Sequence, residues 1–152
     1  MKVIERFAAD QSMSILPTFR ERLTEAADVR AVTVDRWSSG SGSSRNLIEL
    51  STAPRVTVLY AKEFNTARRP GFWGLTRNQV NRLERADVKW FAVLLLRSSA
   101  AGYVLSAAEV RRLIADGSFE LSGDGDYKVN EYLDLRSAQR FESLAELLDH
   151  VL

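Results

Sequence analysis

Lys62 ends the apolar run within the segment RVTVLYAKEF, residues 55–64. A basic stretch that carries Arg68 and Arg69 follows this segment. Alternation along the segment predicts a strand, which places the side chains of Tyr60 and Lys62 on one face. An ammonium group at a strand end can stabilise negative charge on a phosphate or orient a water molecule. Taken by itself, such a lysine is explained by a stem that packs on apolar surface and an amine that extends into water, and only the resemblance described below favours the role at a phosphate.

Positive charge is concentrated in residues 62–89, although the whole chain carries a net charge of only +1. The segment holds seven Lys or Arg and three acidic residues, and seven minus three is +4. On the helix expected at 75–86, the spacing of Arg82, Arg85 and Lys89 predicts a basic stripe that can contact phosphates. A solvated helix face rich in arginine explains the same pattern. The basic residues of the predicted nucleic-acid-binding face are Lys62, Arg68, Arg69, Arg77, Arg82, Arg85 and Lys89.

Phe72 and Trp73 lie beside those arginines, between Gly71 and Gly74. Exposed aromatic rings next to arginine can stack on bases or wedge a duplex. The commoner arrangement of such a pair folds the rings back over the core. Both Phe72 and Trp73 are included in the predicted nucleic-acid-binding set.

Composition excludes several kinds of chemistry. The chain has no cysteine, so disulfides, thiolate nucleophiles and cysteine-ligated zinc are excluded. His150 is the only histidine, which leaves no histidine-based triad or metal cluster. The segment DGSFELSGDGDYK, residues 116–128, has aspartates near glycines but lacks the spacing of a calcium loop, so it is predicted to form turns.

The chain has 152 residues, the size of one ordinary domain, and its hydrophobic content of 45% is typical of a globular protein. Its longest apolar run, WFAVLLL at residues 90–96, is too short to span a bilayer. The first ten residues lack the apolar core of a signal peptide. These features predict one cytoplasmic domain, residues 1–152, with no membrane partner.

The elements that must position these side chains can be read from the spacing of apolar residues. The spacing predicts an opening helix, three strands, a helix, two strands, a helix, a strand and a final helix. This order predicts an α/β domain built on a single mixed β-sheet flanked by helices. The expected ranges are helix 11–27, strands 29–37, 46–52 and 55–64, helix 75–86, strands 89–98 and 102–105, helix 107–117, strand 126–135 and helix 143–151.

Local signals mark several boundaries. Thr76 and Ser106 are expected to be N-caps, and Glu109 completes a capping box with Ser106. The stretch SSGSGSSR, residues 38–45, is expected to be a flexible loop, and STAP, residues 51–54, to form a hairpin turn.

The order of elements, together with two segments, resembles the PD-(D/E)XK nuclease superfamily, which has the restriction-endonuclease-like fold. VTVLYAK, residues 56–62, is similar to the family's third strand, which ends in a carboxylate, any residue and lysine. WFAVLLLRSSAAGYVLSAAEVRRLI, residues 90–114, is similar to the passage that follows in several bacterial members. The resemblance covers the chain from about residue 15 onward. It implies a restriction-endonuclease-like fold, DNA as a partner and, in active members, Mg²⁺-dependent cleavage of phosphodiester bonds.

Two positions depart from the family's motif. Tyr60 stands where the carboxylate is expected, and Asn46 stands near the expected acidic residue of the second strand. Carboxylate oxygens hold the divalent ion in such a site, and tyrosine and asparagine are poor magnesium ligands. The resemblance therefore implies a degraded metal site that keeps Lys62, whose amine we expect to open into a pocket at the rim of the sheet with the basic helix lining its approach.

Three functional hypotheses remain open. The first is a nuclease-like domain that binds DNA, or a non-catalytic partner in DNA processing or genome defence, with an inactive metal site. The second is an active endonuclease with Mg²⁺ as cofactor, in which Glu49 is the metal ligand and joins Lys62 and Glu21 or Glu25 in a relocated catalytic site. The third is a protein-interaction domain, with a protein partner or as a homodimer, that uses the fold as a scaffold and the aromatic pair as an anchor.

Overall fold

The computed structural model describes residues 15–39, 42–64 and 72–152. Five helices and nine strands lie in these ranges. The helices are α2 (Leu16–Val29), α3 (Arg77–Ala86), α4 (Ala107–Ala115), α5 (Glu131–Asp134) and α6 (Leu144–Val151). The strands are β1 (Thr33–Ser39), β2 (Gly42–Thr52), β3 (Arg55–Glu63), β4 (Trp73–Thr76), β5 (Lys89–Leu95), β6 (Gly102–Ser106), β7 (Glu120–Leu121), β8 (Asp126–Val129) and β9 (Gln139–Phe141).

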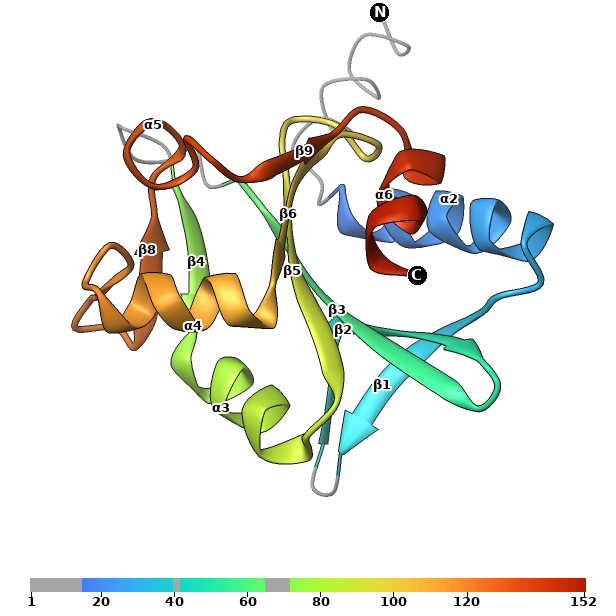
Figure 1. Cartoon of the computed structure of the whole chain (residues 1–152), viewed down its shortest axis with the longest axis horizontal. Helices are drawn as coiled ribbons and strands as arrows, with labels where there is room; N and C mark the ends of the chain where they lie inside the picture. Colours follow the sequence, from blue (N-terminus) through green and yellow to red (C-terminus); the bar gives the residue numbers. More distant parts are fainter. Residues whose placement is uncertain (1–14, 40–41, 65–71) are drawn as a thin grey trace, which may run out of the picture.

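A mixed six-stranded sheet forms the centre of the fold, in the order β1-β2-β3-β5-β6-β9 (Figure 1). The first three strands form an antiparallel meander, and β5 pairs parallel to β3. Strands β6 and β9 then extend the sheet in antiparallel fashion. The predicted α/β class with a mixed sheet flanked by helices is therefore confirmed. A second, antiparallel sheet in the order β4-β8-β7 was not predicted.

The main sheet separates two hydrophobic cores. Helices α2 and α6 cover one face, and α3, α4 and the small sheet cover the other (Figure 1). Because side chains alternate along β3, Leu59 packs into the first core, while Val58 and Tyr60 pack into the second. We call these the α2–α6 core and the α3–α4 core. The five residues before Lys62 are all buried, and apart from Thr57 they are apolar, which explains why β3 reads as a nearly continuous apolar run.

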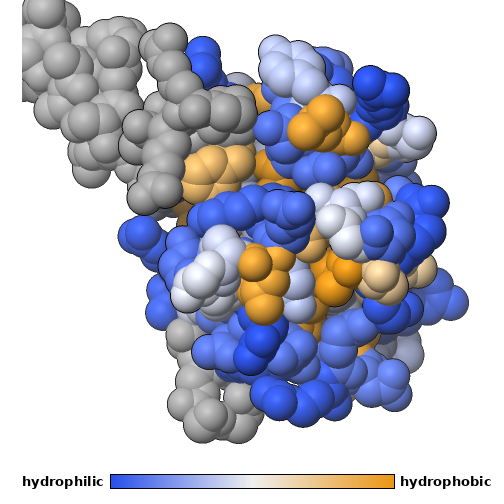
Figure 2. Space-filling model, turned by 90° about the vertical axis from the view of Figure 1, so that its left-hand side faces the viewer, coloured by the Kyte–Doolittle hydropathy of each residue, from blue (hydrophilic) through white to orange (hydrophobic). Residues whose placement is uncertain are grey.

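The side of the molecule that carries β8 and α5 is mostly hydrophilic, and its hydrophobic residues are separated from one another (Figure 2). The exposed large hydrophobic residues of the small sheet and α5 are Leu121 on β7 and Tyr132 and Leu133 on α5. Of the helices that the structure describes, none combines the length and the hydropathy needed to cross a membrane.

The prediction of a flexible loop at 38–45 is wrong, because both flanking strands extend into this segment. Ser38 pairs with Ser43, and β1 and β2 are in register up to Ser39 and Gly42. Serine and glycine are compatible with backbone pairing at the tip of a hairpin, so composition alone misassigned the segment. The predicted hairpin at 51–54 is confirmed by the pairing of Thr52 with Arg55.

The expected helix at 75–86 begins two residues later, at Arg77. Residues Trp73–Thr76 instead form β4, because Leu75 pairs with Tyr127 on β8. Thr76 occupies the N-cap position but makes no side-chain capping bond. The helix ends before Asp87, which has a left-handed backbone with φ of 53°.

The expected strand at 126–135 divides after Val129. The side chain of Asn130 accepts hydrogen bonds from the backbone of Tyr132 and Leu133, which starts α5. Strands β7 and β9 are too short for a periodic signal and were missed. The capping box of Ser106 and Glu109 is confirmed at the start of α4.

Candidate functional site

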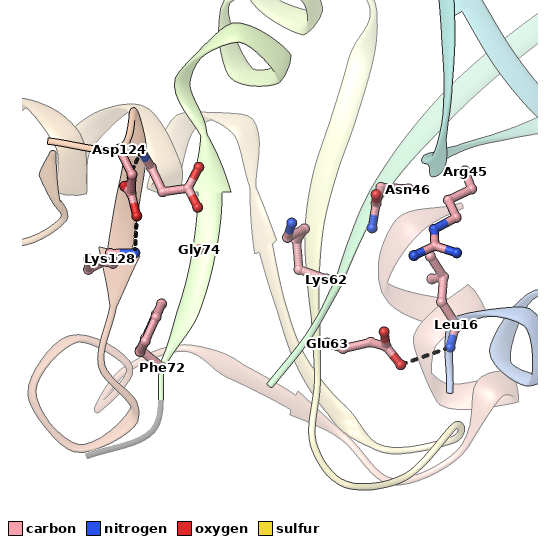
Figure 3. A pocket seen from close by; sticks show the side chains of 10 residues that line it. Leu16, Arg45, Asn46, Lys62, Glu63, Phe72, Gly74, Asp124 and Lys128 are labelled. Carbon is pink, nitrogen blue, oxygen red and sulfur yellow. Dashed lines mark hydrogen bonds and ion pairs between the residues drawn. The ribbon is translucent and has the colours of Figure 1, made fainter. Parts of the chain in front are cut away.

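β3 ends at a cavity of about 340 Å³, which we call the β3 cleft (Figure 3). It lies between the main sheet and the small sheet. On the side of the main sheet and α2 it is lined by Leu16, Arg45, Asn46, Lys62 and Glu63. On the side of the small sheet it is lined by Phe72, Gly74, Asp124, Asp126 and Lys128. The expectation that Lys62 opens into a pocket is confirmed.

Lys62 is half-buried, and its amine carries no counter-ion within the described residues. Nζ lies 6.0 Å from the centre of the Tyr60 ring. Burial lowers the pKa of Lys62 below its ordinary value of 10.5, and the charges of Asp126 and Glu63 oppose that shift only in part. The β3 cleft therefore contains a partly desolvated cation that no side chain within residues 15–39, 42–64 and 72–152 neutralises by an ion pair.

The opposite wall contains a cation that is already neutralised. Lys128 Nζ lies 3.1 Å from Asp124 Oδ2 and 4.3 Å from the centre of the Phe72 ring. The Ser122 hydroxyl and the Asp126 backbone N–H also donate to Asp124, and these contacts lower the pKa of that carboxyl to about 2. Asp124 and Lys128 thus satisfy each other across an exposed turn.

Asp126 differs from Asp124 because none of the described donors binds its carboxylate. The carboxylate lies close to the backbone of Gly74: a Cβ added to that glycine would come within 2.8 Å of Asp126 Oδ2. Asp126 acts on Lys62 through its charge but forms no ion pair with it. A carboxylate and an ammonium, neither of them in an ion pair within the described part of the chain, therefore line opposite walls of one cavity.

Glu63 follows Lys62 but serves a different purpose. Its carboxylate accepts hydrogen bonds from the backbone N–H group of Ile15 and, at 3.1 Å, from that of Leu16, the second of which is drawn in Figure 3. A carboxylate at this position satisfies donors of the first helical turn and interacts favourably with the helix dipole. Glu63 thereby joins the start of α2 to the end of β3 and fixes one wall of the cleft.

The residues at the family's metal positions do not fit a magnesium ion. Tyr60 is buried, and its hydroxyl accepts a hydrogen bond of 2.9 Å from the backbone N–H of Thr76. Asn46 Nδ2 donates to the backbone oxygen of Ala61 at 2.7 Å. Across the described ranges, no group of three or more His, Cys, Asp or Glu residues is arranged to hold a metal ion.

The carboxylates of the relocated-site hypothesis are not brought together with Lys62. Glu49 pairs with Val58, four residues before Lys62 on β3, which puts it roughly 13 Å away along the strand. Glu21 and Glu25 are exposed on α2, which covers the other face of the sheet. None of these three glutamates lines the β3 cleft.

The basic residues of the predicted binding face lie in several places. Arg77 and Arg85 are exposed on α3, and Arg82 lies 5.8 Å from the centre of the Trp37 ring. No residue of α3 lines the β3 cleft, so the expectation that the basic helix lines its approach is corrected. Arg68 and Arg69 lie outside the described residues.

Lys89 does not continue the stripe of α3. The helix ends at Ala86, and Lys89 is the first residue of β5. Its amine lies 5.6 Å from the Phe91 ring, which packs against the α2–α6 core. Lys89 therefore points to the opposite face of the sheet from Arg82 and Arg85.

The aromatic pair divides between core and cleft. Trp73 is fully buried, donates from Nε1 to the backbone oxygen of Leu95 at 2.8 Å, and lies 4.6 Å from the ring of Phe64. The ring is folded back into the core, which was the second of the two arrangements considered for the aromatic pair, and it offers no surface for stacking on a base. Phe72 is half-buried and lines the β3 cleft.

Sequence reasoning missed the residues that the small sheet contributes. Asp124 lies in the segment that was predicted to form turns, and Asp126 and Lys128 lie where that segment overlaps the strand expected at 126–135. Alternation in DYKV, residues 126–129, places Asp126 and Lys128 on one face and Tyr127 and Val129 on the other. That pattern was available, but nothing in it revealed that the segment faces Lys62.

Comparison with known proteins adds no relationship: no protein-family model matches the sequence, and no curated protein is significantly similar to it. The site is therefore interpreted from its own geometry and charges.

Proposed function

We propose that this chain is a restriction-endonuclease-like domain that binds the phosphate groups of nucleic acid, DNA in particular, without metal-dependent cleavage. The observation that carries the proposal is the half-buried ammonium of Lys62, which opens into the β3 cleft with no counter-ion among the described residues. Burying a charge is unfavourable unless a partner compensates it, and an anionic ligand is a suitable partner.

The topology of the main sheet supports the resemblance on which the fold name rests. A helix precedes an antiparallel meander of three strands, and a helix then leads to a strand parallel to the third. Lys62 lies near the end of that third strand, where the resemblance expects the family's lysine. The match is one of order and pairing and says nothing by itself about activity.

The cations at the cleft support phosphate as the ligand. Arg45 lies on the same side of the cleft as Lys62, and its charge lowers the pKa of the lysine. A phosphate between them would relieve this repulsion and accept hydrogen bonds from both groups. Contacts of this kind contribute affinity without sequence specificity.

The two alternatives have weaker support. An active nuclease needs carboxylates that can hold a metal, whereas Tyr60 and Asn46 are engaged in hydrogen bonds and Glu49 lies along the strand from Lys62. A protein-interaction domain anchored on the aromatic pair would need Trp73 at the surface, and this side chain is fully buried.

A binding titration with a matched charge control tests the proposal. Fluorescent single-stranded and duplex DNA is titrated at low ionic strength with the wild type, Lys62→Met and Arg55→Gln. Arg55 is exposed at the opposite end of β3, so its replacement removes the same charge away from the cleft. We expect Lys62→Met to weaken binding about tenfold, because a hydrogen bond to a charged group contributes about 1.5–3 kcal/mol, and Arg55→Gln to have little effect.

Three results would overturn the proposal. The first is the absence of DNA binding by the wild type at low ionic strength, and the second is an equal loss of affinity in both variants. The third is cleavage of DNA with Mg²⁺ or Mn²⁺ that disappears in Lys62→Met, which would restore the enzyme hypothesis.

A further inference from the structure

We propose that the β3 cleft receives the phosphorylated end of a nucleic-acid strand: the terminal phosphate lies between Lys62 and Arg45, and a donor group of the terminal nucleotide binds Asp126. This inference rests on the proposed function and specifies its ligand. It follows from the size of the cleft, from its remaining charges and from the placement of Asp126.

The size of the cleft favours one nucleotide over a continuous backbone. A cavity of about 340 Å³ is at the lower end of the range for small-ligand sites. It is walled by the main sheet on one side and the small sheet on the other, and no residue of the basic helix α3 extends it into a groove. A nucleic-acid strand can therefore place its terminal nucleotide in the cleft.

The charges that remain after internal pairing match a terminal phosphate. Asp124 and Lys128 neutralise each other, and Glu63 is bound to the start of α2. Lys62 and Arg45 are left on one wall, both without an ion pair in the described part of the chain. A terminal phosphomonoester carries about −1.5 to −2 charges near pH 7, more than the single charge of an internal phosphodiester, and two cations suit that dianion.

Asp126 makes a bare anion a poor ligand. Its unpaired carboxylate lines the wall opposite Lys62 and repels any anion that brings no hydrogen-bond donor of its own. A nucleotide carries such donors in its sugar hydroxyls and base amino groups. The cleft is thus complementary to a ligand with an anionic end and a donor-bearing body.

Gly74 provides a way to move Asp126 without changing a charge. A methyl group at this position would come within 2.8 Å of Asp126 Oδ2. Because that atom is the free end of a side chain, the carboxylate can shift while the backbone stays in place. Gly123, in the turn before β8, has no atoms within 4 Å of an added Cβ, so Gly123→Ala is a matched control.

The first experiment compares one oligonucleotide with a terminal phosphate and with a terminal hydroxyl, at both the 5′ and the 3′ end, and also measures a nucleoside monophosphate and inorganic phosphate as competitors. For the wild type we expect about a tenfold preference for one phosphorylated end over its hydroxyl counterpart. Lys62→Met should abolish that preference, and Lys62→Gln provides a second test if the methionine variant does not fold. The nucleoside monophosphate should compete more weakly than the phosphorylated strand, since it lacks the contacts that the next nucleotides of the strand make.

The second experiment tests Asp126 through the ratio of affinities for the phosphorylated strand and for sulfate, an anion that carries no proton near pH 7 and so brings no hydrogen-bond donor. Asp126→Asn and Gly74→Ala should both lower this ratio several-fold, whereas Gly123→Ala should leave it unchanged. An unchanged ratio in both Asp126→Asn and Gly74→Ala would overturn the role of Asp126.

The outcomes separate this inference from the proposed function. Equal binding of phosphorylated and hydroxyl ends, with Lys62→Met still weakening both, overturns the strand-end ligand and leaves phosphate binding at Lys62 intact. A nucleoside monophosphate that binds as tightly as the strand also overturns it. Loss of every Lys62 effect overturns both proposals.

Discussion

The ammonium of Lys62 is retained at a position where burial disfavours its charged form. Its pKa in the folded protein is lowered by desolvation, in a setting where Asp126 and Glu63 attract the charge and Arg45 and Lys128 repel it. A lowered lysine pKa means that the folded state holds this proton less tightly than the unfolded state does. The charged lysine therefore destabilises the fold below its folded pKa, and this penalty is relieved as pH rises from that value toward 10.5.

Replacement of Lys62 should reveal this penalty directly. We expect Lys62→Met to unfold at a higher urea concentration than the wild type at pH 7, because it removes the desolvated charge. The difference should shrink as the pH is raised through the folded pKa toward 10.5. A loss of stability in Lys62→Met at pH 7 would contradict this account, since it would mean that the amine already has a stabilising partner.

Tyr60 makes a structural hydrogen bond at the position where the resemblance leads one to expect a carboxylate. Its hydroxyl is the acceptor for the Thr76 backbone N–H at the point where β4 ends and α3 begins. Tyr60→Phe should lower the free energy of unfolding by about 1–3 kcal/mol, the usual range when a buried donor loses its partner. Tyr132→Phe, at a side chain that is 79% exposed, serves as the control and should have no measurable effect in the same urea titration.

At the level of elements, the close approach of two strands depends on Gly102. A Cβ at this position would lie 2.2 Å from the backbone oxygen of Leu94, at the start of the pairing between β5 and β6. Gly102→Ala should therefore cost on the order of 3 kcal/mol, the upper part of the range for overpacking, because backbone rather than a side chain must move.

Urea unfolding followed by circular dichroism measures this cost, and Gly123→Ala is the comparison because its added methyl meets nothing within 4 Å. Equal stabilities of the two variants would show that β6 can shift without loss of pairing.

Elements with a strong local signal could be predicted from the sequence. The meander, β5, α4 and α6 have clear apolar periodicity or capping residues, and their existence was predicted with errors of up to four residues at their ends. Strands β4 and β7 exist through their pairing with β8, so their four and two residues carry no periodic signal of their own. Lys62 could be singled out because its strand is apolar, whereas Asp126 could not, since its position opposite Lys62 depends on the packing of the small sheet.

At the scale of the whole molecule, all three tryptophans lie on one side of the main sheet. Trp37, Trp73 and Trp90 all belong to the α3–α4 core. Tryptophan fluorescence therefore reports on one face of the sheet, whereas circular dichroism reports on the whole chain. The two probes together test the prediction of a single cooperative domain.

Leu148 lies fully buried in the α2–α6 core, on the other side of the sheet from every tryptophan. We expect Leu148→Ala to lower the free energy of unfolding by about 2–5 kcal/mol. The shift should be the same by fluorescence and by circular dichroism if both cores unfold together. A fluorescence transition that stays at the wild-type midpoint would mean that the two cores unfold separately; Leu152→Ala, at a residue 44% exposed, should shift neither signal.

The number of phosphate contacts, rather than the net charge of +1, sets how strongly salt affects binding. If Lys62 and Arg45 supply two phosphate contacts, the logarithm of the affinity for single-stranded DNA should fall with the logarithm of salt concentration with a slope of about −1.4. Titrations over a range of ionic strength measure this slope. A slope of about −4 or steeper would mean that the arginines of α3 carry most of the interaction.

The small sheet is assembled from connecting segments. β4 comes from the link between β3 and α3, and β7 and β8 come from the link between α4 and β9. None of the hydrogen-bonded ladders of the six-stranded sheet includes them. Under the proposed function, substitutions of the lining residues Asp124, Asp126 and Lys128 would change what the cavity recognises without touching the strands that hold Lys62, so this wall is the natural target for engineering altered selectivity.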